Sequence, residues 1–109
     1  MSGNQLKVFK MLKDDFMRRK NDDLWTPLAK GLEESGCADH DYLSHTEGRA
    51  IEDVISSINR MSFNECCTWL TWIVRGERFC EGLFTSCLDD GTLLALLTRA
   101  CDVLSVKDM

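Results

Sequence analysis

The feature that most limits the fold is the spacing of the apolar residues from Thr46 onward, which is helical and never alternating. Residues three and four apart share one face of a helix, whereas a strand requires every second residue to be apolar. One such helical run comprises Ile51, Val54, Ile55, Ile58 and Met61. Its β-branched members would individually favour a strand, but the period favours a helix. The sequence therefore predicts an all-α fold, a compact bundle of five or six helices.

A chain of 109 residues, 44% of them hydrophobic, is long enough for one modest core. We expect a single helical domain over residues 1–109, with a basic amphipathic helix at 1–20 and a helical core at 46–104. The N-terminus lacks the uninterrupted apolar stretch of a signal peptide, and no run of about 18 apolar residues could span a bilayer. These features predict a cytoplasmic protein that does not associate with membranes.

The net charge of −5 is unevenly distributed along the chain. Residues 1–20 hold six Lys/Arg and two acidic residues, whereas residues 21–109 hold seven and sixteen. The acidic body disfavours binding to nucleic acid, so the basic helix is the one exception. Its apolar stripe consists of Leu6, Phe9, Leu12 and Phe16. We expect this stripe to dock on the chain's own body or on a second copy.

Boundary signals divide the chain further. Thr26 should cap a helix with Pro27 at its first position, and Gly36 should end it. Residues 37–45 form the expected loop. Ser62 and Glu65 have the spacing of a capping box, so another helix should begin there. Its predicted inward stripe comprises Phe63, Cys66, Cys67, Leu70, Ile73 and Val74.

The stretch 75–91, RGERFCEGLFTSCLDDG, combines charge, cysteine and glycine at helical spacing. A break is expected near Gly76, followed by a helix whose inward side comprises Phe79, Cys80, Leu83, Phe84, Cys87 and Leu88. Thr92 to about Leu104 should be the most buried helix, and the residues after it should fray.

Two groups in this half of the chain are candidate binding residues. Arg78 and Glu81 should share the outward side, and Arg75 joins them if the helix continues from the preceding one without a break; the two arginines could bind a carboxylate or phosphate. Pairing of the arginines with Glu77, Glu81 or the ends of neighbouring helices is the competing interpretation. Trp69 and Trp72 lie off the inward stripe of their helix, so they need another cover. The basic helix, a homodimer interface and a protein partner are the three alternatives.

The six cysteines lie mostly within apolar helical stretches, which favours reduced thiols over disulfides. We expect Cys66, Cys67, Cys80, Cys87 and Cys101 to be thiols in the core. Cys37, His40 and His45 form the one arrangement that resembles a metal site, but they lack a recognised ligand spacing. No metal and no cofactor is expected.

The motif RGERFCEG at residues 75–82, followed by DDGTLLALL, resembles an uncharacterised domain family of bacteria and their phages. The resemblance covers roughly residues 47–104. It implies a small helical domain of prokaryotic or phage origin, and it transfers no catalytic residue.

An acidic helical chain without a nucleophile and base linked by spacing favours a protein-protein interaction module over an enzyme. One form of this hypothesis is an inhibitor that a phage or mobile element encodes against a host or defence protein. The alternative is a nucleic-acid-associated regulator that uses the basic residues Lys7, Lys10, Lys13, Arg18, Arg19 and Lys20. A small hydrolase is less favoured.

Overall fold

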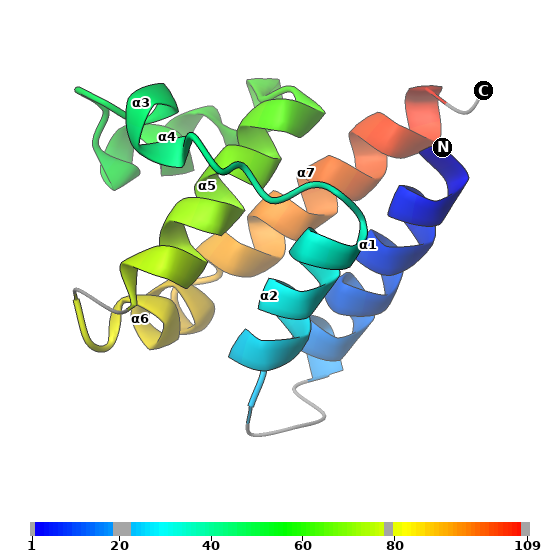
Figure 1. The fold of residues 1–109 in the computed structure, drawn as a ribbon, viewed down its shortest axis with the longest axis horizontal. Coiled ribbons are helices and arrows are strands. Elements are labelled where there is room, and N and C mark those ends of the chain that lie inside the picture. The colour runs from blue at the N-terminus through cyan, green and yellow to red at the C-terminus, as the bar shows by residue number, and fades with distance from the viewer. Residues whose placement is uncertain (1, 19–22, 78–79, 108–109) are drawn as a thin grey trace.

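The computed structural model describes residues 2–18, 23–77 and 80–107, and within these ranges it contains helices and no strand. The all-α prediction is confirmed (Figure 1). The elements are α1 (Ser2–Arg18), α2 (Trp25–Glu34), α3 (Tyr42–His45), α4 (Ile51–Ser57), the 3₁₀ turn η1 (Ile58–Arg60), α5 (Phe63–Gly76), α6 (Leu83–Asp89) and α7 (Thr92–Lys107). The described residues thus hold more helices than expected, partly because α3 lies within the predicted loop. None of these helices is both long and apolar enough to cross a bilayer.

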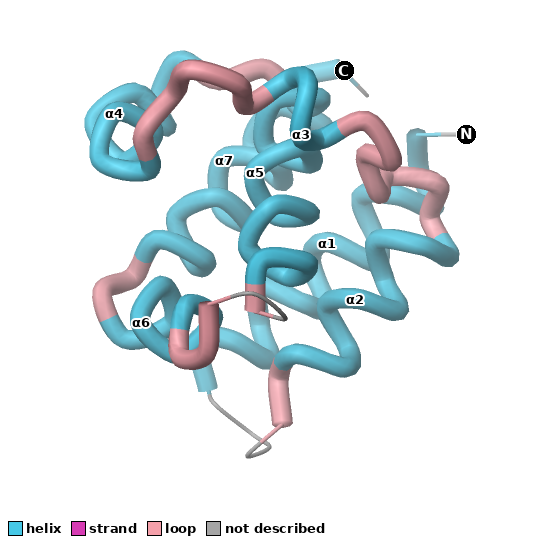
Figure 2. Tube along the Cα trace, turned by 60° about the vertical axis from the view of Figure 1, so that its left-hand side comes forward, coloured by secondary structure: helices cyan, strands magenta, loops and turns pink. Residues whose placement is uncertain are grey.

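The core is formed where α7 packs between α1 and α5 (Figures 1 and 2). Helix α7 is heavily buried, and its fully buried residues include Leu93, Leu96, Leu97 and Ala100. It is not the most buried helix, as the sequence predicted, because other helices surround α5 on several sides and bury more of its residues.

Three of the four stripe residues of α1, namely Phe9, Leu12 and Phe16, are buried, and Leu6 is half-buried. Phe9 is in edge-to-face contact with Phe63 at 5.3 Å between ring centroids. The basic helix therefore docks on its own chain, which is one of the two expected arrangements.

The start of α2 differs from the prediction, because Thr26 does not cap the helix. Asp23 instead binds a free amide of the first turn: its Oδ1 accepts a hydrogen bond from the Thr26 amide at 3.1 Å. The end of α2 is as expected. Gly36 has a φ of 72°, a left-handed conformation that suits glycine, and the Cys37 amide bonds back to the Leu32 carbonyl at 2.9 Å.

The predicted capping box of α5 is confirmed. The Ser62 hydroxyl accepts from the Glu65 amide at 3.2 Å, while the Glu65 carboxylate accepts from the Ser62 amide at 3.3 Å. All six residues of the predicted inward stripe are buried.

The single helix expected from Thr46 is shorter in the structure. α4 begins only at Ile51, since Gly48 has a φ of 76° and Ala50 is extended. Ile55, expected on the inward side, is 47% exposed. Helix α4 has only seven residues, and Val54 is the one that is buried. The side that faces the core is therefore too narrow to include Ile55.

The helix expected after Gly76 begins only at Leu83. Gly82 has a φ of 92°, and the Glu77 carboxylate caps α6 by accepting from the amides of Gly82 at 2.9 Å and Phe84 at 2.8 Å. Cys80 lies in the turn before this cap and is exposed, so its assignment to the core is wrong. Phe79 lies outside the described residues. Gly76 is closely packed: a Cβ there would lie 2.7 Å from Leu83 Cδ2.

Candidate functional site

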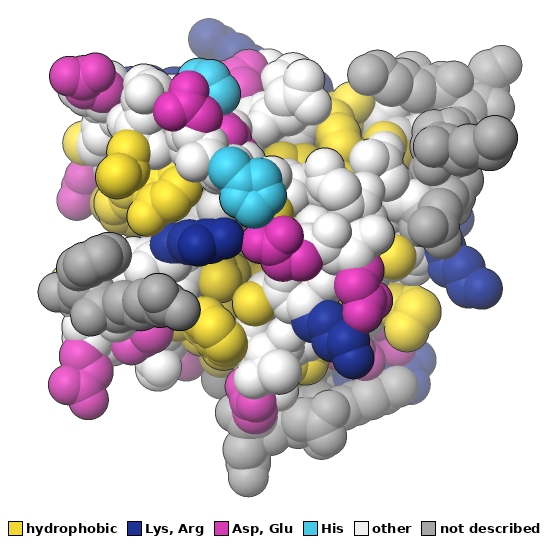
Figure 3. Space-filling model, in the orientation of Figure 1, with side chains coloured by type: hydrophobic (Ala, Val, Ile, Leu, Met, Phe, Trp, Pro, Cys, Tyr) yellow, Lys and Arg dark blue, Asp and Glu magenta, His cyan; other side chains and the backbone are white. Residues whose placement is uncertain are grey.

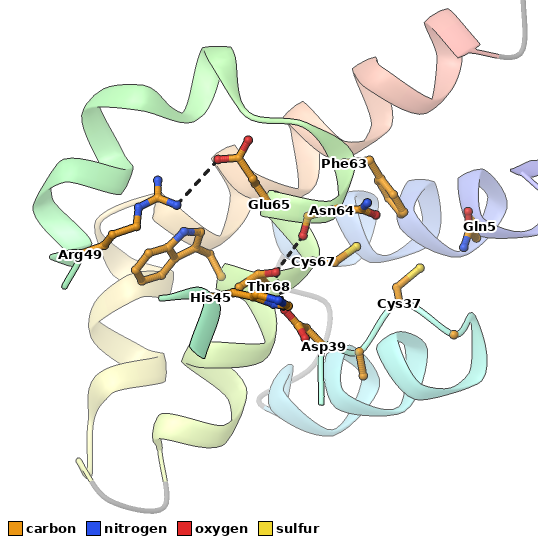
Figure 4. Close-up of a pocket in the computed structure, with 13 residues that line it drawn as sticks. Gln5, Cys37, Asp39, His45, Arg49, Phe63, Asn64, Glu65, Cys67 and Thr68 are labelled. Carbon is orange, nitrogen blue, oxygen red and sulfur yellow. Dashed lines mark hydrogen bonds and ion pairs between the residues drawn. The ribbon is translucent and has the colours of Figure 1, made fainter. Parts of the chain in front are cut away.

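An open pocket of about 560 Å³ lies between the turn after α2, α3 and the N-terminal half of α5 (Figure 4). This volume lies within the range of small-molecule and side-chain binding sites. The pocket has two ends of different chemical character (Figure 4). Asp39, His45, Arg49 and Glu65 form a charged end, whereas Cys37 and Cys67 lie at the other end together with Gln5.

Asp39 organises the charged end. Its carboxylate accepts hydrogen bonds from the Thr68 hydroxyl at 2.6 Å, the His45 Nδ1 at 2.6 Å and the Asp41 amide at 2.9 Å. The Asp39 amide in turn donates to Thr71 Oγ1 at 3.1 Å. These bonds attach the loop before α3 to two successive turns of α5. The side chains of the charged end are therefore held in place by several hydrogen bonds.

The same bonds set the ionisation of the charged end. Burial raises the pKa of the Asp39 carboxyl, but hydrogen bonds from Thr68 and His45 outweigh it and leave the pKa below its ordinary value. The hydrogen bond and charge of Asp39 raise the pKa of His45. The pair therefore favours a carboxylate beside an imidazolium.

Arg49 covers Trp69, with its guanidinium carbon 5.6 Å from the indole centroid. Its Nη1 also lies 3.8 Å from Glu65 Oε2. The expectation that Trp69 points away from the core is wrong, because this side chain is 1% exposed. Helix α5 is buried around more of its circumference than one stripe, with α7 and α2 on some sides and α3 on another. Within the chain, Arg49 in the loop before α4 and Trp72 on α5 both contact the Trp69 ring.

Trp72 is half-buried and forms an edge-to-face pair with Trp69 at 5.3 Å between ring centroids. It packs against the rim of the core. As predicted, this residue does not point fully into the core.

The opposite end of the pocket holds two buried thiols. Cys37 is 7% exposed and Cys67 is 4% exposed. A hydrogen bond from the Cys67 thiol lowers the pKa of Cys37 to about 7, and the same bond, together with burial, raises the pKa of Cys67. The structure assigns no disulfide to any of the six cysteines, all of which lie in the described ranges.

No metal site is formed by the three residues singled out from sequence. The Cys37 thiol faces the Ser35 carbonyl, His45 bonds Asp39, and His40 Nε2 faces Glu33 at 3.8 Å, so their donor atoms do not converge. Over residues 2–18, 23–77 and 80–107, no group of three or more His, Cys, Asp or Glu could hold a metal ion.

The pocket also lacks the link that nucleophilic catalysis requires. His45 directs its ring nitrogens toward Asp39 and Asp41, whereas the Cys37 thiol donates to the Ser35 carbonyl at 3.7 Å. A cysteine and an acid–histidine pair therefore share the pocket without forming a relay.

The predicted binding residues are not brought together. Arg75 Nη2 donates to Glu33 Oε1 at 3.0 Å at the end of α2, which is the pairing that the structural interpretation predicted. It borders a separate hollow of about 190 Å³ beside Trp25. Glu81 is exposed in the turn before α6, and Arg78 lies outside the described residues. Of the four that the structure describes, Trp69 alone lines the 560 Å³ pocket.

Sequence reasoning missed the residues that shape the charged end, Asp39, Arg49 and Thr68. The signal available was the run CADHDYLSH, whose density of acids and histidines is unusual for a plain linker. Its contact with Thr68 depends on how the loop folds back over α5, which no local pattern encodes.

The chain matches the model of a family of unknown function, DUF6508, over residues 18–105. This match covers most of the chain, and the protein belongs to that family. It extends well before residue 47, where the resemblance noted from sequence began. No curated protein and no solved structure matches the chain.

Proposed function

We propose that this protein is a protein-interaction module that binds a basic segment of a partner protein over residues 37–55, here called the acidic segment, and in the pocket beside it. The acidic segment holds five carboxylates and one arginine, a formal net charge of −4 with histidine neutral. Such a surface attracts positively charged partners and repels nucleic acid.

The observation that carries the proposal is the exposure of aliphatic side chains within this charged surface. Leu43 is 68% exposed and Ile55 is 47% exposed, on two short helices next to an open pocket. Figure 3 shows carboxylates, histidines and hydrophobic side chains gathered over α3 and α4. Apolar anchors within a charged rim are typical of protein interfaces.

The proposal includes no catalytic step, because the pocket thiol Cys37 and the His45 imidazole are not hydrogen-bonded to each other. An inhibitor of a host or defence protein, encoded by a phage or mobile element, is a narrower form of the same proposal. That form rests on the resemblance of the RGERFCEG motif and on the acidic surface.

A displayed library of random peptides, selected on the immobilised protein, tests the proposal. We expect the selected peptides to be rich in Lys and Arg, to carry an apolar residue, and to bind more weakly as salt rises. Leu43→Ser should weaken their binding at least about fivefold. Met11→Ser is the matched control, since Met11 is 59% exposed on α1.

Two results would reject the interaction proposal. One is a set of peptides without enrichment in basic residues, and the other is equal binding by the Leu43→Ser and Met11→Ser variants. Low-salt binding of random duplex DNA, removed by Lys7→Gln with Lys10→Gln on α1, would support the nucleic-acid regulator instead.

A further inference from the structure

A cationic side chain of the protein itself lies at the charged end of the pocket. Arg49, the one arginine of the acidic segment, has its guanidinium carbon 5.6 Å from the indole centroid of Trp69, and its Nη1 lies 3.8 Å from Glu65 Oε2. All three residues line the pocket, and Figure 4 shows Arg49 and Glu65 facing each other. An aromatic face beside a carboxylate is a combination that binds guanidinium groups, through cation–π attraction and charge.

Arg49 is held loosely in this position. Its 3.8 Å separation from Glu65 is longer than a hydrogen bond, and the two side chains are 40% and 44% exposed. Exposed ion pairs of this kind contribute little to stability. The loop backbone is fixed independently of the side chain, because the Arg49 amide donates to the Thr46 carbonyl at 3.1 Å. The guanidinium can therefore leave the indole while the loop keeps its conformation.

The two carboxylates at this end of the pocket differ in what they bind. Asp39 accepts hydrogen bonds from α5, from α3 and from its own loop, so it is committed to the fold. Glu65 accepts from the Ser62 amide at 3.3 Å through Oε1, and its Oε2 faces Arg49. The Oε2 atom of Glu65 is therefore the carboxylate oxygen that can exchange one guanidinium for another without breaking a bond of the fold.

We propose that the Trp69 indole and the Glu65 carboxylate form a subsite for an arginine of the partner's basic segment, and that Arg49 fills this subsite in the free protein. The inference rests on the proposed function, because it assigns one side chain of that basic partner to one place in the pocket. It also narrows the ligand. A planar guanidinium stacks on an indole, whereas a lysine ammonium is a strongly hydrated point charge, so the subsite should prefer arginine.

An internal competitor changes the affinity in a defined direction. The apparent Kd of a ligand equals its intrinsic Kd divided by the fraction of molecules whose subsite is free. If Arg49 fills the subsite for about nine-tenths of the time, its removal should tighten binding by about tenfold. A carboxylate ligand would show the opposite behaviour, because Arg49 would then be its binding partner and its removal would weaken binding.

The test titrates N-acetyl-arginine methylamide into the full chain and follows the assigned indole N–H signal of Trp69 by NMR. The corresponding lysine and aspartate derivatives are titrated in the same way. We expect the arginine derivative to shift the Trp69 signal and to bind at least about threefold more tightly than the lysine derivative.

Two pairs of variants separate the subsite from the general charge of the surface. Arg49→Gln should tighten binding of the arginine derivative at least about threefold more than Arg60→Gln, which removes the same charge from the exposed end of η1. Glu65→Gln should weaken binding at least about threefold more than Glu52→Gln, which removes an exposed carboxylate of α4. Glutamine at position 65 can still accept from the Ser62 amide, so the capping box is kept.

Three results would overturn the subsite: no response of the Trp69 signal to the arginine derivative, equal effects of Arg49→Gln and Arg60→Gln, or tighter binding of the aspartate derivative that Arg49→Gln removes. Failure of the subsite differs from failure of the proposed function. Selected peptides rich in Lys and Arg that leave the Trp69 signal unchanged would reject the subsite and keep the interaction module. Binding of the arginine derivative at Trp69, without any selection of basic peptides, would keep the subsite and reject the basic partner segment.

Discussion

Two regions of this molecule are held together by different forces. The helices α1, α5 and α7 are joined by apolar side chains that are almost fully buried, such as Phe9, Leu70 and Leu97. The stretch from Gly36 to Ala50 instead attaches to α5 largely through polar groups, above all Asp39 and its partners Thr68 and Thr71. The first region depends on buried area, and the second depends on a few specific bonds.

This difference predicts two levels of stability. Apolar burial over three long helices is cooperative, so the core should unfold as one unit. A segment attached by few polar contacts can open locally without global unfolding. The proposed partner site borders the second region, where a binding event would have the most effect on mobility.

The largest expected effect comes from breaking the core. Leu97→Ala should lower the free energy of unfolding by about 2–5 kcal/mol, because Leu97 is 0% exposed and leaves a cavity. The matched change Leu43→Ala should alter it by less than about 0.5 kcal/mol, since Leu43 is 68% exposed. Urea unfolding followed by circular dichroism measures both, and equal losses would refute the contrast between the regions.

Removing the polar anchor of the second region should have a smaller and more local effect. Asp39→Ala loses the acceptor for Thr68, His45 and the Asp41 amide, which should cost about 1–3 kcal/mol. Hydrogen exchange should accelerate over residues 37–50 while α7 stays protected. Acceleration spread equally over α1 and α7 would mean that the segment is part of the cooperative core.

The same division separates what could be predicted from sequence. The core was predictable because helical periodicity reports burial directly: the stripe of α5 and most of the stripe of α1 are buried as expected, and α7 is heavily buried, although less so than α5. The capping box at Ser62 was predictable because its two reciprocal bonds are local.

The second region was not predictable from local patterns. Arg49 contacts Trp69, and Asp39 bonds Thr68. The two residues of each pair are far apart in the chain. The break between Gly76 and Leu83 was only partly predicted, because it depends on Glu77 capping α6 across a turn. The pocket arises from such non-local contacts, which is why the binding residues chosen from sequence lie mostly elsewhere.

The cap of α5, the helix to which both regions attach, offers a prediction of intermediate size. Ser62→Ala should cost about 1 kcal/mol by leaving the Glu65 amide without its acceptor. Ser56→Ala is the matched control, because the Ser56 hydroxyl donates only to the Asp53 carbonyl on an exposed surface. Thermal unfolding of both variants should rank Ser62→Ala as the less stable.

The smallest expected effect is the dependence of the second region on pH. The pKa of His45 is raised in the folded protein by Asp39, so its contribution to stability is complete below the ordinary histidine pKa. That contribution is lost as the pH rises through the folded pKa. The pKa of Asp39 is lowered, so its contribution is present above the ordinary aspartate pKa and is lost as the pH falls through the folded value.

The attachment of the loop before α3 should therefore be strongest between the ordinary pKa values of aspartate and histidine. Raising the pH from about 6 to about 8 should accelerate hydrogen exchange over residues 37–50 in the wild-type protein and less so in His45→Gln. An NMR titration of the His45 ring should give a pKa above about 6.5 that falls back in Asp39→Asn. The effect should be small, because the His45 side chain is 57% exposed and solvent screens the pair. An His45 pKa that does not change in Asp39→Asn would show that the 2.6 Å contact does not hold the imidazolium in solution, and that Thr68 and Thr71 alone anchor Asp39 to α5.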